Sequence, residues 1–194
     1  MLIKDTDFID LPVFVKGKVR NVYDLGDSLL MVVTDRISAF DVVFDELIPN
    51  KGKVLSSISA FWFDFTKDIL PNHVISTNPE EYPMGLSKYK EELQGRSMLV
   101  KKVKMLPAEC IVRGYLEGSA LKEYNANGTV GGIKMPEGLL QGDKLPSPLF
   151  TPSTKEDTGH DININYDQLV DLIGIEDAQA LRDSSLALYT KVSE

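Results

Sequence analysis

The chain of 194 residues carries a formal net charge of −8, with 43% hydrophobic and 26% charged residues. This composition is typical of one large or two small globular domains, and it argues against intrinsic disorder. The negative balance disfavours nucleic acid and acidic membranes as partners, because both repel an acidic surface. Cys110 is the single cysteine, which excludes an intrachain disulfide and a Cys-based zinc site.

The first ten residues are rich in charge where a signal peptide would need an apolar core. No stretch is apolar over the length of a membrane span. We therefore expect a cytoplasmic protein.

The first third of the chain has the pattern of β-strands. Two extended runs, residues 19–25 and 29–34, flank the turn residues Gly26-Asp27-Ser28 and predict a β-hairpin. Shorter apolar runs at 13–15 and 42–44 predict further strands.

An amphipathic helix is expected next. Its apolar residues recur every three or four positions at Leu55, Ile58, Trp62, Phe65 and Ile69, which places them on one helical face. Pro71-Asn72 is expected to end the helix. We interpret the apolar face as the side that packs on the sheet, in preference to an aromatic platform for a ligand.

The remaining segments alternate between connection, strand and helix. Residues 72–96 are expected to be connecting structure with at most one short helix. Strands are predicted at 97–106 and 109–113, interrupted by Pro107, and a helix is predicted to begin within 118–124. Residues 125–161 are expected to be mainly loop, and a loop of that length is often functional.

A final helix is predicted from the spacing of Ala178, Leu181, Ser185, Leu188 and Val192. No Gly, Asn or Pro follows to end it, so the chain is expected to finish inside a helix, as if natural sequence once continued beyond it.

Four segments have residues suited to chemistry. The first is Lys16-Gly17-Lys18-Val19-Arg20, at the entry to a predicted strand. Glycine permits close approach of the backbone to a phosphate, and Lys18 and Arg20 at alternating positions would share one strand face. Solvated basic pairs on strands are common, so this segment alone is a weak indication.

The second segment, residues 34–41, follows an apolar strand and contains Arg36, Ser38 and Asp41 together with Asp35. Loops after strands often hold ligand contacts, and these side chains offer a guanidinium, a hydroxyl and two carboxylates. The alternative is a turn with Asx-type hydrogen bonds and one surface ion pair.

The third segment places Arg113 at a strand end and Gly118-Ser119 at a helix start. A guanidinium, a hydroxyl and the free N–H groups of a helix N-terminus together make a phosphate site. The alternative is that Ser119 is a simple N-cap. The glycine spacing favours the functional interpretation.

The fourth segment contains Lys155, His160 and Asp161. His160 and Asp161 are suited to proton transfer or to contact with a metal, although a histidine with no other ligand at metal-binding spacing is usually not a metal site. The alternative is that Asp161 or Asn163 caps the helix near Tyr166 and that His160 is a solvated loop residue.

Taken in order, the four segments resemble the SAICAR synthetase family, the phosphoribosylaminoimidazole-succinocarboxamide synthases. KGKVRNVYDLG is similar to the family's phosphate loop and TDRISAFD to its first substrate loop. MLPAECIVRGYLEGSALKEY is similar to the family signature, and LFTPSTKEDTGHD resembles the long-form version of a later active-site loop. The signature departs from the family pattern at Ala108 and at Glu117, whose carboxylate is expected to point away from a phosphate. The family's downstream Asp-x-Lys-x-Glu-Phe-Gly element is absent, so the chain resembles a C-terminally truncated member.

The resemblance implies an α+β fold of two lobes. An N-terminal antiparallel β lobe, residues 1–106, would bind nucleotide. An incomplete second lobe, residues 107–194, would bind substrate, with ATP in the cleft between the lobes. The implied activity is an ATP-dependent ligation, with Mg²⁺, of L-aspartate to 5-amino-1-(5-phospho-D-ribosyl)imidazole-4-carboxylate in purine biosynthesis. The alternative is a nucleotide-binding module of the same fold without catalysis.

The resemblance also implies roles for individual residues. The residues expected to bind ATP are Gly17, Lys18, Arg20, Lys104, Leu106 and Glu109. The residues expected to bind the ribotide substrate are Arg36, Ser38, Asp41, Arg113, Gly118 and Ser119. Lys155, His160 and Asp161 are expected at the reacting groups as the catalytic residues. No residue is predicted to ligate a metal.

Overall fold

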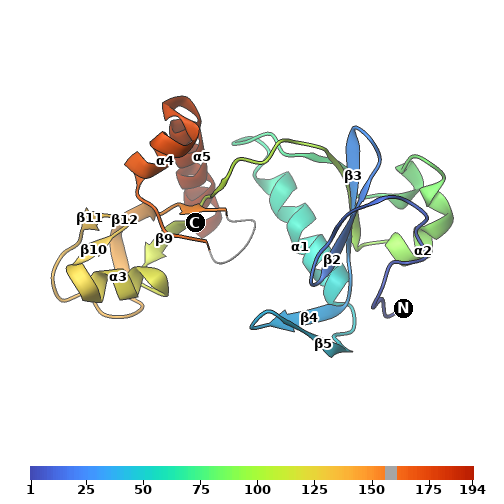
Figure 1. Cartoon of the computed structure of the whole chain (residues 1–194), viewed down its shortest axis with the longest axis horizontal. Coiled ribbons are helices and arrows are strands. Elements are labelled where there is room, and N and C mark those ends of the chain that lie inside the picture. Colours follow the sequence, from blue (N-terminus) through green and yellow to red (C-terminus); the bar gives the residue numbers. More distant parts are fainter. Residues whose placement is uncertain (156–160) are drawn as a thin grey trace. The chain divides into compact units, whose positions relative to one another are not determined.

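The computed structural model describes residues 1–155 and 161–194. The fold is α+β, as predicted, and the chain divides into two compact units, Met1–Lys104 and Met105–Glu194 (Figure 1). Among the described residues, no helix is long and apolar enough to cross a membrane.

A five-stranded antiparallel sheet forms the centre of the first unit. Its strand order is β1-β2-β3-β7-β6. The strands are β1 Val13–Lys16, β2 Arg20–Asp24, β3 Ser28–Val33, β7 Ser97–Lys101 and β6 Val74–Ser76. The predicted hairpin is confirmed as β2 and β3. The strand β6 lies in the segment expected to be connecting structure.

The two faces of the sheet have different neighbours, because side chains alternate along β3. Leu30 and Val32 point into the main hydrophobic core, where they pack with Tyr23, Leu99 and buried side chains from the connection between β6 and β7. This connection contains η1 Pro79–Glu81, η2 Leu86–Tyr89 and α2 Lys90–Leu93. Met31 and Val33 point to the opposite face, where helix α1 Lys51–Phe65 lies.

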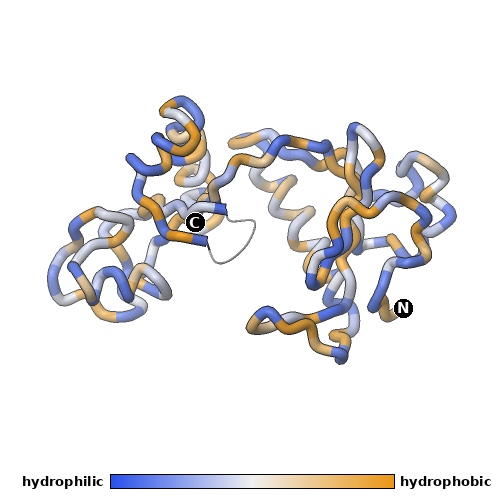
Figure 2. The backbone as a smooth tube through the Cα atoms, in the orientation of Figure 1, coloured by the Kyte–Doolittle hydropathy of each residue, from blue (hydrophilic) through white to orange (hydrophobic). Residues whose placement is uncertain are grey.

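Helix α1 is present as predicted, but two details of the prediction are wrong. The buried positions are Gly52 and Ser56, whereas Leu55, Ile58, Trp62 and Phe65 are exposed. The apolar stripe is therefore not the side that packs on the sheet. Apolar residues recur along the whole helix (Figure 2), so periodicity alone did not say which face is buried.

The helix also ends at Phe65, before the predicted Pro71. The backbone N–H and the hydroxyl of Thr66 both donate to the carbonyl of Trp62, at 3.0 and 2.6 Å. The side-chain amide of Asn72 donates to the carbonyl of Phe63 at 3.0 Å. These bonds satisfy terminal carbonyl groups that a longer helix would have used.

A separate hairpin of β4 Arg36–Ala39 and β5 Val42–Leu47 completes the first unit. Its two-residue turn, Phe40-Asp41, has positive φ at both positions, 49° and 64°. Such a turn matches the twist of a tight hairpin.

The described part of the second unit contains short sheets and three helices. Strand pairs are β8 Ala108–Glu109 with β13 Ser153–Thr154, β9 Val112–Tyr115 with β12 Lys144–Phe150, and β10 Thr129–Val130 with β11 Ile133–Lys134. The helices are α3 Ser119–Asn127, α4 Tyr166–Ile173 and α5 Ile175–Ser193.

The prediction of mainly loop for 125–161 missed the seven-residue strand β12. This strand contains Pro146 and Pro148, which suggested a loop. Both prolines are tolerated because β12 pairs with β9 alone among the described strands, and its register shifts between Lys144 and Leu149.

Helix α4 begins with a capping box. The Asn165 side chain accepts a hydrogen bond from the N–H of Gln168, and the Gln168 side chain accepts one from the N–H of Asn165, both at 2.9 Å. The sequence had suggested Asp161 or Asn163 as the cap, and that suggestion is wrong.

Candidate functional site

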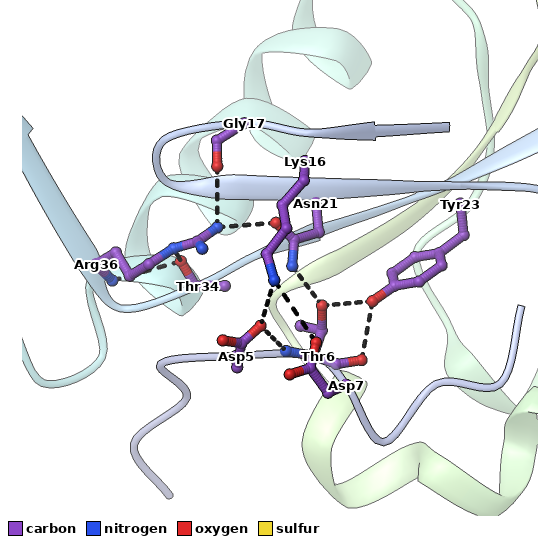
Figure 3. A network of polar contacts seen from close by, with 9 residues as sticks. All are labelled: Asp5, Thr6, Asp7, Lys16, Gly17, Asn21, Tyr23, Thr34 and Arg36. Carbon is purple, nitrogen blue, oxygen red and sulfur yellow. Dashed lines mark hydrogen bonds and ion pairs between the residues drawn. The ribbon is translucent and has the colours of Figure 1, made fainter. Parts of the chain in front are cut away.

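The loop between β1 and β2 is held from inside the first unit by Arg36 (Figure 3). Its Nη2 donates to the carbonyl of Gly17 at 3.1 Å and to Asn21 Oδ1 at 2.8 Å, and its Nε donates to Thr34 Oγ1 at 3.0 Å. The Gly17 N–H donates to the Arg20 carbonyl at 2.8 Å. A Cβ at Gly17 would lie 2.9 Å from that carbonyl oxygen, so the loop requires glycine.

A second layer of hydrogen bonds ties this loop to the N-terminal segment (Figure 3). Asn21 Nδ2 donates to Thr6 Oγ1 at 2.6 Å, and the Tyr23 hydroxyl donates to the Thr6 carbonyl at 2.8 Å. Lys16 forms ion pairs with Asp5 at 3.3 Å and Asp7 at 3.7 Å. These contacts hold the loop between β1 and β2, the candidate phosphate loop, in one conformation.

Two predictions about this region change. Arg36 is buried, and its Nε and Nη2 atoms donate hydrogen bonds within the chain, so the structure gives it a role in holding the loop.

Strand β2 begins only at Arg20, so Lys18 lies in the loop. The argument that Lys18 and Arg20 share one strand face therefore does not apply. Lys18 instead pairs with Asp41 in the β4–β5 turn. Ser38 lies half-buried in β4.

A cavity of about 410 Å³ lies between the sheet and α1. Val19, Met31, Val33 and Met98 line its sheet side, and Arg20 belongs to its wall. Helix α1 contributes Leu55, Ser56, Ser59 and Phe63 to the lining, and His73 also lines the cavity. Burial lowers the pKa of His73 below its ordinary value, so this imidazole is neutral at pH 7.

Arg113 is the centre of the second candidate site. Its Nη2 donates to Ser119 Oγ at 2.8 Å, its Nε to Thr151 Oγ1 at 3.2 Å and its Nη1 to the Glu117 carbonyl at 3.3 Å. These bonds fix the guanidinium beside the N-terminus of α3. The N-cap is Gly118, with φ of 60°, and no side chain caps the helix. The interpretation of Ser119 as a simple N-cap is therefore wrong.

Glu123 lines the same small hollow as Arg113. Its carboxylate accepts hydrogen bonds from the N–H groups of Gly131 and Gly132 at 2.9 and 3.0 Å, and from the Thr129 hydroxyl at 2.7 Å. Burial raises the pKa of Glu123, but these bonds and Arg113 outweigh burial and hold it below its ordinary value. The hollow itself is small, about 10 Å³, so a ligand phosphate would lie at its mouth.

Glu117, which departs from the family signature, was expected to direct its carboxylate away from the phosphate site, and its contacts agree with this. Its carboxylate accepts a hydrogen bond from Gln141 Nε2 at 2.7 Å. Only the backbone carbonyl of Glu117 meets Arg113.

Lys155 links two further predicted residues. It forms an ion pair with Glu109 and a longer one, 3.9 Å, with Asp161. The bond to Glu109 raises the pKa of Lys155, so the amine is charged at neutral pH. His160 lies outside the described residues. Lys104 is exposed and Leu106 half-buried, and their contacts to ATP stay predictions.

Sequence reasoning missed Thr151 and Glu123 as parts of the Arg113 site. Both come from segments expected to be helix interior or loop, and only the pairing of β9 with β12 brings Thr151 to Arg113. Within the described residues there is no group of three His, Cys, Asp or Glu side chains able to hold a metal ion.

Comparison with known proteins decides the family. The family model described as SAICAR synthetase matches residues 13–194. The chain belongs to the SAICAR synthetase family. Relatives named phosphoribosylaminoimidazole-succinocarboxamide synthase include those of Geobacter sulfurreducens, 55% identical, and Thermodesulfovibrio yellowstonii, 52% identical, each matched over 100% of this chain. The chain spans 66% of the length of each.

Solved structures agree with this membership. A SAICAR synthase from Saccharomyces cerevisiae, complexed with SAICAR, is 42% identical, with a TM-score of 0.86 over 97% of this chain and 64% of its own. A SAICAR synthetase in complex with ADP is 23% identical, with a TM-score of 0.70 over 93% of this chain and 66% of its own, and shows likeness of fold alone.

Proposed function

We propose that the chain provides the nucleotide and ribotide sites of an ATP-dependent ligase. The reaction joins L-aspartate to 5-amino-1-(5-phospho-D-ribosyl)imidazole-4-carboxylate and yields SAICAR, ADP and phosphate. The observation that carries this proposal is the Arg113 guanidinium, held by Ser119 and Thr151 beside the N-terminus of α3. Free N–H groups and a fixed guanidinium suit a phosphate monoester such as that of the ribotide.

The nucleotide part of the proposal rests on the first unit. The cavity of about 410 Å³ has apolar walls, and Arg20 lines it beside the Gly17 loop. That size and lining suit a base or nucleoside with its phosphates at a cationic rim. A related synthetase has been solved with ADP. Gly17, Lys18 and Arg20 would hold the phosphates, and Lys104, Leu106 and Glu109 would face the rest of the nucleotide.

The chemistry requires activation of a carboxylate, because a carboxylate at neutral pH is a poor acyl donor. Its oxygen takes the γ-phosphoryl group of ATP, which releases ADP and leaves an acyl phosphate. The aspartate amine then attacks the carbonyl carbon, phosphate leaves with the C–O bond electrons, and the nitrogen loses a proton. Lys155 and Asp161, with His160 and the substrate-loop residues Ser38 and Asp41, would orient the reacting groups. Mg²⁺ would supply charge neutralisation at the phosphates. No described residue is assigned to it.

The alternative is a nucleotide-binding module without catalysis. Arg113, Ser119 and Thr151 argue against it, because a module that binds only ATP has no use for a second phosphate site in the other unit.

The test is ADP release by the 194-residue chain with magnesium-ATP, the ribotide and aspartate, omitting each in turn. Release that needs all three supports the ligase. Release that continues without ribotide or aspartate contradicts it and indicates a plain ATPase. Nucleotide binding without any release favours the module.

A further inference from the structure

Glu123 lies on the face of α3 that also carries Ser119, four residues earlier in the helix. Its two carboxylate oxygens divide between two neighbouring N–H groups: Oε2 accepts from Gly131 at 2.9 Å, and Oε1 accepts from Gly132 at 3.0 Å. Both glycines have positive φ, 60° and 80°, and they make the two-residue turn between β10 and β11. The carboxylate therefore fixes the backbone of this turn.

The glycine turn packs against Thr151. A Cβ placed on Gly131 would lie 3.1 Å from Cγ2 of Thr151, so the turn lies directly against that methyl group. The Thr151 hydroxyl accepts a hydrogen bond from Arg113 Nε at 3.2 Å. A line of contacts thus runs from Glu123 through the turn and Thr151 to the guanidinium.

The negative charge of Glu123 needs a physical reason, because a carboxylate close to a phosphate repels it. Glu123, Arg113 and Thr151 line one small hollow, so this repulsion would act at the proposed phosphate site. Two N–H groups that meet separate oxygens require an acceptor at both positions. Glutamate supplies two acceptors, whereas glutamine would direct its NH2 group towards one of the N–H groups. The hold on the turn therefore explains why an acidic residue stands here.

We propose that Glu123 is a positioning residue for phosphate binding: it holds the Gly131-Gly132 turn against Thr151 and so keeps the Arg113 guanidinium in place beside the N-terminus of α3. Glu123 acts through Arg113 and does not touch the ligand. The role assigned to Glu123 rests on the proposed function, since the ribotide supplies the phosphate group. The constraint on Arg113 is a property of the chain alone.

The first measurement is the affinity of the 194-residue chain for the ribotide, by calorimetry. Glu123→Gln is expected to weaken binding by about tenfold, because a loosened guanidinium must be ordered when the ligand binds. If Glu123 contributed only its charge, the same variant would bind the anionic ribotide more tightly, because a repulsive charge is removed. Tighter or unchanged binding would overturn the proposal.

The matched control is Glu137→Gln, which makes the same change of charge at an exposed position of the second unit. It is expected to leave the affinity for the ribotide within about twofold of the parent value. The affinity for magnesium-ATP, proposed to bind the first unit, should be equal in the parent and both variants. Circular dichroism of each variant checks that it is folded.

A double-mutant cycle with Thr151→Val tests the route from Glu123 to Arg113. Valine keeps the shape of threonine but lacks the hydroxyl that accepts from Arg113. In this background Glu123→Gln is expected to have little further effect on ribotide affinity, because the link to the guanidinium is already broken. The same loss in both backgrounds would show that Glu123 acts by another route, against the proposal.

The NMR signal of the Arg113 Nε–H group reports the constraint without any ligand. The parent chain is expected to give a separate signal, because the hydrogen bond to Thr151 slows exchange with water. Glu123→Gln is expected to lose this signal through faster exchange, whereas Glu137→Gln keeps it. A signal that persists in Glu123→Gln would overturn the proposal. A parent chain that binds no ribotide contradicts the proposed function, and the Arg113 signal then decides the role of Glu123 by itself.

Discussion

At the scale of single residues, Asp35 and Arg96 form a buried ion pair in the first unit. The two side chains are 0% and 1% exposed and lie 3.1 Å apart. Asp35 also accepts hydrogen bonds from the N–H groups of Ile3 at 2.9 Å and Gly52 at 3.0 Å. One carboxylate thus joins the N-terminal segment, the start of α1 and the start of β7. The sequence suggested Asp35 as a ligand contact, and its burial gives it this structural role.

Asp35→Asn is expected to lower the free energy of unfolding at pH 7 by about 3 to 5 kcal/mol, because it leaves Arg96 buried without its counter-charge. Burial raises the pKa of Asp35, but the two N–H groups and Arg96 outweigh it and hold the pKa below its ordinary value of 3.8. The stabilisation is therefore full above that value and is lost as the pH falls through the lower folded-state pKa. Denaturant titrations from pH 7 to pH 2 measure this.

The control is Asp64→Asn, which removes an exposed ion pair with Lys67 on the same unit. It is expected to change the free energy of unfolding by no more than about 1 kcal/mol. Equal losses for the two variants would contradict the assignment.

Arg113 is the residue proposed to bind phosphate in the second unit. Arg113→Ala is expected to weaken ribotide binding by about 2 to 4 kcal/mol while the chain stays folded. Arg113→Lys should recover little, because an ammonium cannot reach Thr151, Ser119 and the Glu117 carbonyl together. Ribotide binding by calorimetry and folding by circular dichroism check both claims.

Arg182→Ala is the matched control, since Arg182 pairs with its neighbour Asp183 on the surface of α5. It is expected to leave ribotide binding unchanged. An Arg113→Ala chain that is unfolded would refute the assignment of Arg113 to ligand binding.

At the scale of elements, the sequence predicted which segments are regular better than what each one faces. Strands β2 and β3 followed from two extended runs and a turn, and α5 followed from helical spacing. The buried face of α1 was predicted wrongly because Gly52 and Ser56 have low helix propensity and are not apolar. A close approach of a helix to a sheet nevertheless requires such small side chains. Tertiary pairing, which brings Thr151 to Arg113, leaves no local pattern.

Gly52→Ala tests that close approach. The added Cβ would lie 2.4 Å from the Val33 carbonyl oxygen and 3.0 Å from that of Thr34, and backbone atoms cannot move away cheaply. We expect a loss of about 1 to 3 kcal/mol in the free energy of unfolding, although alanine favours a helix over glycine. Ser57→Ala, on an exposed position of α1, is expected to be neutral or slightly stabilising. If Gly52→Ala is also stabilising in thermal denaturation, the tight contact is refuted.

At the scale of the whole molecule, an acidic chain is proposed to bind anionic ligands. The net charge of −8 repels ATP, ribotide and aspartate over long distances. Binding must then come from local cations, and the two best-defined ones, Arg20 and Arg113, lie in separate units.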